Sequence, residues 1–147
     1  MLIPFSKESR DKYYKLLDKV FDSGFLSDGS MLKTFEENFS KYTALESVAV
    51  SNGGTGLLAI LDYIDVKGKD VIVPSNTFWA SAQSIKKAGG NPVYADCNKE
   101  DLCLSYNDLI KKVTDNTKAV MVVHIGGHIA FDIEKIATFC NRRGFCP

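Results

Sequence analysis

A glycine-rich segment in the first half of the chain carries residues that could bind a phosphate group. Ser51-Asn52-Gly53-Gly54-Thr55-Gly56 follows the short apolar run Val48-Ala49-Val50 and opens an apolar helical stretch. Free backbone N–H groups and the helix dipole favour a phosphate at such a helix N-terminus. The segment lacks the Gly-Lys-Ser/Thr ending of a P-loop, which argues against a nucleoside triphosphatase.

Three interpretations of this segment remain open on its residues. Gly54-x-Gly56-x-x-Ala59 fits a loose dinucleotide fingerprint, but the next apolar run ends in Val73-Pro74-Ser75, without the acidic residue that a nicotinamide site requires. A single phosphate held by Gly53, Gly54 and the Thr55 amide and hydroxyl needs no such acid. A glycine-rich turn that binds nothing fits equally well.

Two aromatic residues follow the next apolar run, in Pro74-Ser75-Asn76-Thr77-Phe78-Trp79. A planar ring that carries one phosphate could stack on such an aromatic face. Phe78 and Trp79 could equally be core residues of the helix that begins here.

Two histidines follow the third apolar run, Val120-Met121-Val122-Val123. His124 and His128 are four residues apart on a loop without a nearby carboxylate or cysteine pattern, so we expect no metal site and a hydrogen-bonding role for His124. The cysteines show no C-x-x-C spacing and indicate unpaired thiols.

Alternating short apolar runs and helical patterns must position these residues. We expect an α/β fold whose open, mostly parallel sheet has helices on both faces. Its strands are predicted at 47–51, 70–73, 92–95 and 118–123, and its helices at 8–22, 31–42, 55–64, 79–88, 106–113 and 131–143. Ligands of such sheets bind beyond the carboxyl ends of the strands, where all three clusters fall, so we expect them to line one pocket.

Composition excludes several classes of partner. Eighteen basic and eighteen acidic residues among 147 give a net charge of zero, and no run of like charges predicts binding to nucleic acid or to a membrane surface. No stretch approaches the roughly 20 apolar residues of a membrane span, and the N-terminus does not resemble a signal peptide. We therefore expect a cytoplasmic protein.

The ordered segments of the chain resemble the DegT/DnrJ/EryC1/StrS family of pyridoxal-phosphate-dependent sugar aminotransferases. The resemblance is carried by Ile3-Pro4-Phe5-Ser6, Ser23-Gly24-Phe25-Leu26-Ser27-Asp28-Gly29, Phe35-Glu36-Glu37-x-Phe39, the loop from Ser51 to Thr55, Asp70-Val71-Ile72-Val73-Pro74-Ser75-x-Thr77-Phe78, Pro92-Val93-Tyr94-Ala95-Asp96 and Thr117-Lys118-Ala119-Val120-x-Val122-Val123-His124-x-Gly126. It implies the front half of the large domain of a fold-type I aminotransferase. We expect one partial domain over 1–147, with N-terminal helices in 1–45 and βα repeats in 46–147.

The resemblance also implies roles for particular residues. Gly53, Gly54 and Thr55 would hold the phosphate of pyridoxal 5'-phosphate, with either Gly54 or Thr55 in the position of the family's threonine. Phe78 would stack on the pyridine ring. Phe25, Asp28 and His124 would lie on the substrate side.

The family's catalytic residues have no counterpart among the 147 residues of this sequence. The aspartate that contacts the pyridine nitrogen and the lysine that forms the Schiff base lie, in the family, beyond the equivalent of Pro147. Lys67 and Lys69 are expected at the opposite edge of the sheet, and Lys86 and Lys87 late in a helix that runs away from the pocket, so we assign no catalytic residue.

The resemblance thus implies the N-terminal part of an enzyme that aminates a keto sugar, nucleotide-linked, for polysaccharide or glycoconjugate biosynthesis. Glutamate or glutamine would donate the amino group, the intact enzyme would be a homodimer, and this chain would be inactive alone. The alternatives are a non-catalytic ligand-binding module and a fragment of a nicotinamide-dependent oxidoreductase.

Overall fold

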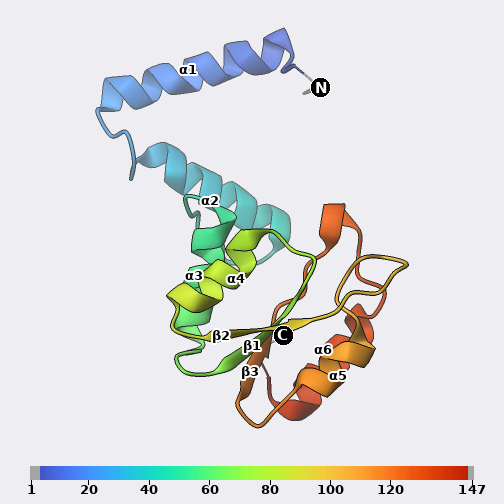
Figure 1. The fold of residues 1–147 in the computed structure, drawn as a ribbon. Coiled ribbons are helices and arrows are strands. Elements are labelled where there is room, and N and C mark those ends of the chain that lie inside the picture. The colour runs from blue at the N-terminus through green and yellow to red at the C-terminus, as the bar shows by residue number, and fades with distance from the viewer. Residues whose placement is uncertain (1–3, 146–147) are drawn as a thin grey trace. The chain divides into compact units, whose positions relative to one another are not determined.

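A computed structural model of the chain describes residues 4–145, so Ile3 of the segments discussed above lies outside the described residues. The chain divides into two compact units, Met1–Ala49 and Val50–Pro147. The first unit consists of helices and their connections, and the second contains the sheet. Figure 1 shows both units.

The first unit contains α1 (Lys7–Ser23) and α2 (Ser30–Thr43). The Ser6 hydroxyl accepts the Ser9 amide at 3.1 Å and caps α1, and Gly24 ends that helix with φ of 69°, a left-handed conformation that glycine adopts without strain. Neither helix contains a buried residue.

The strand predicted at 47–51 does not form. The Ala49 amide donates to Glu36 Oε1 at 2.9 Å, and the Ser47 amide donates to Ser40 Oγ at 3.0 Å. Two side chains of α2 therefore take amides that a strand would donate to a neighbouring strand. The prediction of a strand was wrong, because a strand requires backbone hydrogen bonds to a neighbouring strand. Here the backbone amides donate to side chains of α2 instead.

The second unit follows the predicted alternation of helices and strands. Its elements are α3 (Gly53–Tyr63), β1 (Asp70–Pro74), α4 (Trp79–Lys87), β2 (Asn91–Ala95), α5 (Tyr106–Lys112), β3 (Thr117–Val120), the 3-10 turn η1 (Ile125–Gly127) and α6 (Ile133–Arg143). The three strands are all parallel, in the order β2-β1-β3, with Ile72 opposite both Val93 and Val120. The predicted α/β fold is confirmed, although β3 is shorter than the run 118–123.

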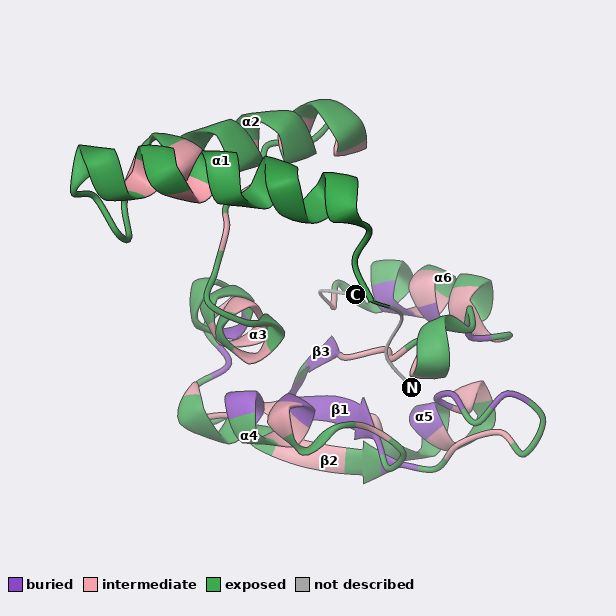
Figure 2. Ribbon diagram, turned by 90° about the horizontal axis from the view of Figure 1, so that it is seen from above, coloured by how far each residue is buried: buried purple, intermediate pink, exposed green. Residues whose placement is uncertain are grey.

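Helices cover both faces of the sheet, as predicted. Because side chains alternate along a strand, Ile72 of β1 packs on the face that carries α5 and α6, and Val71 and Val73 pack on the face that carries α3 and α4. All three are fully buried, and the central position of β1 is visible in Figure 2. The starts of α3 and α4 lie close to each other, since a Cβ at Gly54 would be 3.6 Å from the Cβ of Ala80, and α4 follows the carboxyl end of β1.

Candidate functional site

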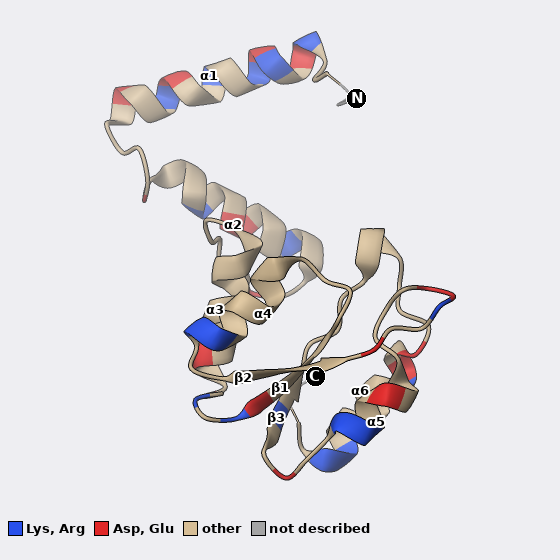
Figure 3. Cartoon of the chain, in the orientation of Figure 1, with Lys and Arg blue, Asp and Glu red and all other residues tan. Residues whose placement is uncertain are grey.

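A cleft of about 620 Å³ runs between α3 and α4 and contains two of the three clusters predicted to bind a ligand. Its lining includes Gly53, Gly54 and Thr55 on one side and Phe78 and Trp79 on the other. The structure therefore brings all four predicted cofactor-binding residues, Gly53, Gly54, Thr55 and Phe78, to one opening. The cleft is nearly free of charged side chains, as Figure 3 shows for the start of each of its two helices.

The first turn of α3 offers hydrogen-bond donors to this cleft. Asn52 caps the helix, since its Oδ1 accepts the Thr55 amide at 3.0 Å. Within residues 4–145, the amides of Gly53 and Gly54 donate to no acceptor, as expected for the first residues of a helix. A Cβ at Gly54 would lie 3.2 Å from Asn52 Oδ1, whereas one at Gly53 would meet nothing within 4 Å.

Hydroxyl groups stand beside these amides. Thr55 Oγ1 lies 3.1 Å from Ser51 Oγ and 3.3 Å from Asn52 Oδ1. The Thr55 amide is used by the cap, so the groups left for an anion are the Gly53 and Gly54 amides and the Ser51 and Thr55 hydroxyls. Ser51 and Asn52 were not among the predicted site residues, although an Asn three positions before a Thr at a helix start is a recognisable capping signal.

Phe78 and Trp79 form an exposed aromatic pair rather than part of the core. Each is 67% exposed, and their ring centroids lie 5.4 Å apart at an interplanar angle of 51°. The sequence left open the alternative that both residues are buried in the core beneath α4. That alternative is therefore wrong. Phe78 directly precedes α4, which places both rings at the mouth of the cleft.

Lys87 also lines the cleft, although the sequence places it on a helix that leads away from the pocket. It lies eight residues after Trp79 on α4, which corresponds to roughly 12 Å along the helix axis. The backbone of Lys87 therefore lies at the opposite end of α4 from Phe78 and Trp79.

The predicted substrate-side residues lie elsewhere. His124 is exposed, and its Nδ1 accepts the Ala130 amide at 3.1 Å. It is not among the residues that line the cleft. Phe25 and Asp28 are exposed residues of the connection between α1 and α2, in the other unit.

A separate carboxylate network organises the loop between β2 and α5. Asp101, 5% exposed, accepts the Phe131 amide at 2.7 Å and the Cys103 amide at 3.0 Å. The hydrogen bond from Phe131 lowers the pKa of Asp101 below its ordinary value against the opposing effect of burial.

Asp132 belongs to the same network and accepts the Asn98 side-chain amide and the Tyr106 backbone amide, each at 3.1 Å. Burial acts to raise the pKa of Asp132. Its hydrogen bonds, of which the one from Lys135 has the largest effect, outweigh burial, so the pKa of Asp132 is lowered below its ordinary value. Both carboxylates stabilise loops and lie outside the cleft.

Residues 4–145 contain no group of three or more His, Cys, Asp or Glu side chains arranged to hold a metal ion. The helices in this range include none long and apolar enough to cross a membrane.

Curated relatives are similar to nearly the whole of this chain. GDP-perosamine synthase of Vibrio cholerae is 35% identical over 97% of the chain and 40% of its own length. dTDP-4-dehydro-2,3,6-trideoxy-D-glucose 4-aminotransferase of Saccharopolyspora spinosa is 33% identical over 86% of the chain and 34% of its own length. The chain thus spans well under half of the length of these relatives.

Solved structures agree with the sequence comparison. NtdA from Bacillus subtilis, solved with bound cofactor PMP, superposes with a TM-score of 0.89 at 26% identity and covers 97% of this chain and 35% of its own. The model of one aminotransferase family matches residues 7–146 of this sequence. This match confirms the resemblance that the ordered motifs indicate. This chain belongs to the DegT/DnrJ/EryC1/StrS aminotransferase family.

Proposed function

We propose that this chain is the front portion of a pyridoxal-phosphate-dependent aminotransferase that aminates a keto sugar. The observation that carries the proposal is the cleft in which the free amides of Gly53 and Gly54 face the same opening as the exposed Phe78 ring. Family membership favours this interpretation over a nicotinamide site, for which the required acidic residue is absent from the end of β1.

The residues of the cleft fit a phosphorylated pyridine. The first-turn amides of α3 and the Ser51 and Thr55 hydroxyls would hold the phosphate dianion, which the positive end of the helix dipole also favours. Phe78, with Trp79 beside it, offers an aromatic face to the ring. When bound, pyridoxal 5'-phosphate supplies an electron sink for transamination.

Trp79 provides a direct test because it is the only tryptophan of the chain and it lines the cleft. The chain is titrated with pyridoxal 5'-phosphate and, separately, with pyridoxal, and Trp79 fluorescence is followed. Saturable quenching by the phosphorylated compound, relieved by inorganic phosphate, is expected, with much weaker binding of pyridoxal. Equal binding of the two compounds would overturn the proposed phosphate site.

We also propose that the chain has no transaminase activity by itself. Among residues 4–145, Lys87 is the lysine that lines the cleft, and its backbone lies about 12 Å along α4 from that of Trp79, at the other end of the helix from Phe78. The chain is treated with pyridoxal 5'-phosphate at the concentration that saturates quenching, then with borohydride, and digested for mass spectrometry. We expect no stoichiometric adduct at Lys87. An adduct on Lys87 that disappears in Lys87→Ala would contradict this expectation.

The substrate proposal follows from the relatives. Their names describe enzymes of GDP- and dTDP-linked sugars, which supports a nucleotide-linked keto sugar as acceptor and an amino acid as donor. Phe25, Asp28 and His124 are proposed on the substrate side, and Phe25 is 68% exposed and so accessible to a ligand. A cytoplasmic homodimer that serves polysaccharide biosynthesis is the corresponding proposal for the intact enzyme.

A further inference from the structure

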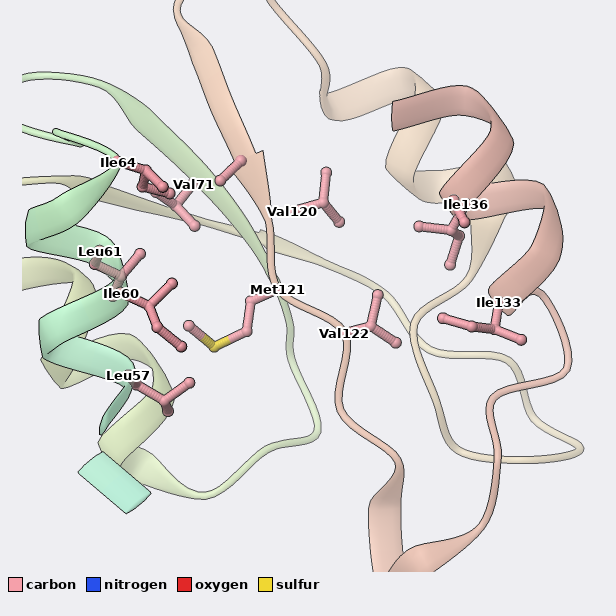
Figure 4. A pocket seen from close by; sticks show the side chains of 12 residues that line it. Leu57, Ile60, Leu61, Ile64, Val71, Val120, Met121, Val122, Ile133 and Ile136 are labelled. Carbon is pink, nitrogen blue, oxygen red and sulfur yellow. The ribbon is translucent and has the colours of Figure 1, made fainter. Parts of the chain in front are cut away.

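Buried hydroxyl groups distinguish the two clefts that border α3. Among residues 4–145, the side chains that line the cleft between α3 and α6, about 250 Å³ in volume, are all apolar, and Figure 4 shows Ile60, Met121 and Ile133 among them. The lining of the cleft between α3 and α4 includes Ser81, which is only 6% exposed. Because a buried hydroxyl group needs a hydrogen-bond partner, the partner of Ser81 is part of the structure beneath this cleft.

The partner is Thr77, the residue that directly precedes the aromatic pair. Thr77 Oγ1 and Ser81 Oγ lie 2.7 Å apart. The Ser81 amide donates to the Phe78 carbonyl at 3.0 Å. Ser81 is therefore bonded through its side chain to the residue before Phe78 and through its backbone to Phe78 itself. Together these two hydrogen bonds fix the backbone from which the Phe78 ring projects.

Phe78 occupies a position that a capping side chain usually holds. It is the N-cap residue of α4, with φ of −67° and ψ of 140°, and its side chain makes no hydrogen bond to the helix. Ser, Thr, Asp and Asn are preferred there because their oxygen accepts an amide of the first turn, which an aromatic ring cannot do. The hydroxyl group stands one residue earlier, at Thr77, and contacts the third residue of the helix. The first turn of α4 is thus held by a side chain while the Phe78 ring stays exposed.

We propose that Thr77 and Ser81 are positioning residues, whose hydrogen bond holds the Phe78 ring in place for the pyridine ring of the cofactor. This inference rests on the proposed function, and it assigns to both residues an action through Phe78 rather than through the phosphate group. It therefore requires a selective effect. Loss of the bond weakens the stacking of the two rings and leaves the phosphate-binding amides of α3 unchanged.

Thr77→Val tests this effect, because it removes the hydroxyl group and keeps the branched shape of the side chain. Quenching of Trp79 fluorescence gives the Kd of pyridoxal 5'-phosphate, and competition gives the Kd of inorganic phosphate. In Thr77→Val we expect binding of pyridoxal 5'-phosphate to weaken about tenfold and binding of phosphate to change less than about twofold. Thr77→Ser retains the hydroxyl group and should restore both values.

A double variant tests whether the two residues act through one bond. Ser81→Ala should weaken binding of pyridoxal 5'-phosphate as Thr77→Val does. Because both substitutions break the same hydrogen bond, the variant that carries both should bind no more weakly than either single variant.

Thr117→Val is the matched control for a loss of stability alone. Thr117 is 7% exposed at the start of β3, and its Oγ1 accepts the Thr114 amide at 3.0 Å. The control thus loses a hydrogen bond of a buried threonine at the amino-terminal end of the sheet, and it should leave both Kd values unchanged. Urea unfolding followed by circular dichroism compares the stability of the two variants.

Hydrogen exchange of the Ser81 amide provides a measurement that needs no ligand. This amide donates to the Phe78 carbonyl, so its exchange rate reports how firmly Phe78 is held against α4. We expect exchange at least about tenfold faster in Thr77→Val than in the wild-type chain, and a wild-type rate in Thr117→Val.

Three results would overturn the positioning role. They are equal binding of pyridoxal 5'-phosphate by Thr77→Val and Thr117→Val, an equal loss of phosphate and pyridoxal 5'-phosphate binding in Thr77→Val, and an unchanged exchange rate of the Ser81 amide in Thr77→Val. Equal binding of pyridoxal 5'-phosphate and pyridoxal by the wild-type chain is a different result, since it removes the proposed phosphate site and this inference with it. The two failures are therefore distinguishable.

Discussion

The residues at the start of α3 combine a structural role with the phosphate-binding role that we propose for them. Asn52 accepts the Thr55 amide and so fixes the first turn, while Gly53 and Gly54 keep their amides available. Thr55 joins the two roles, because its amide belongs to the cap and its hydroxyl lies beside Ser51. Substitutions here can therefore separate phosphate binding from helix stability.

Replacement of Thr55 by valine should weaken the binding of pyridoxal 5'-phosphate about tenfold, because a hydrogen bond to a charged group contributes on the order of 1.5–3 kcal/mol. Quenching of Trp79 measures the change. Thr34→Val is the matched control, since its hydroxyl donates to the Ser30 carbonyl in α2, in the other unit. Equal weakening in both variants would exclude a specific role for Thr55.

Asp101 should make the stability of the second unit depend on pH. Its pKa is lowered in the folded chain from the ordinary value of 3.8, so its carboxylate stabilises the fold above that value and loses this effect as the pH falls through the lowered pKa. The wild-type chain should therefore exceed Asp101→Asn in urea midpoint near neutral pH, with a difference that shrinks below about pH 4.

Circular dichroism in urea, at neutral pH and in acid, measures both midpoints. Asp62→Asn, at an exposed position of α3, is the control and should change little at either pH. A difference between wild type and Asp101→Asn that stays constant across this range would show that the hydrogen bonds from Phe131 and Cys103 do not depend on the charge of Asp101.

At the scale of elements, α3 depends on tertiary packing and on its cap. It has eleven residues, three of them glycines in the first turn, which is too short and too glycine-rich to be stable by itself. Leu61 anchors it in the core with Val71 and Val73, while its first turn projects to the cleft. The cap therefore determines how well the proposed phosphate-binding turn is ordered.

Asn52→Ala should lower the free energy of unfolding by about 1 kcal/mol, the usual cost of losing an N-cap side chain. Urea unfolding followed by Trp79 fluorescence measures this change. Asn52→Ser keeps a capping oxygen and should retain most of the stability. If the alanine and serine variants are equally destabilised, the Asn52 side chain stabilises the protein in some way other than as a cap.

At the scale of the whole molecule, the two units differ in how they are stabilised. The buried core residues all belong to the second unit, whereas α1 and α2 contain no buried residue among those that the structure describes. Helices of this length depend on packing for their stability. The first unit should therefore open far more readily than the second.

Limited digestion with trypsin should first cut at lysines of the first unit and accumulate a fragment that begins at Tyr42, after cleavage at Lys41. Mass spectrometry of the time course identifies the fragments. Early cleavage after Lys67 or Lys111 in the second unit, with the first unit intact, would reverse the expected order of stability.

The sequence by itself determined the types and order of most elements, the α/β class, the family and four of the residues that line the proposed cofactor cleft. These features depend on local signals: apolar periodicity, glycine and proline positions, and motifs read in order. Only the tertiary structure decided that 47–51 is not a strand, that Phe78 and Trp79 are exposed and that Lys87 shares the cleft. Each of these depends on partners distant in sequence, such as Glu36 for Ala49, and local patterns carry no information about which partner is present.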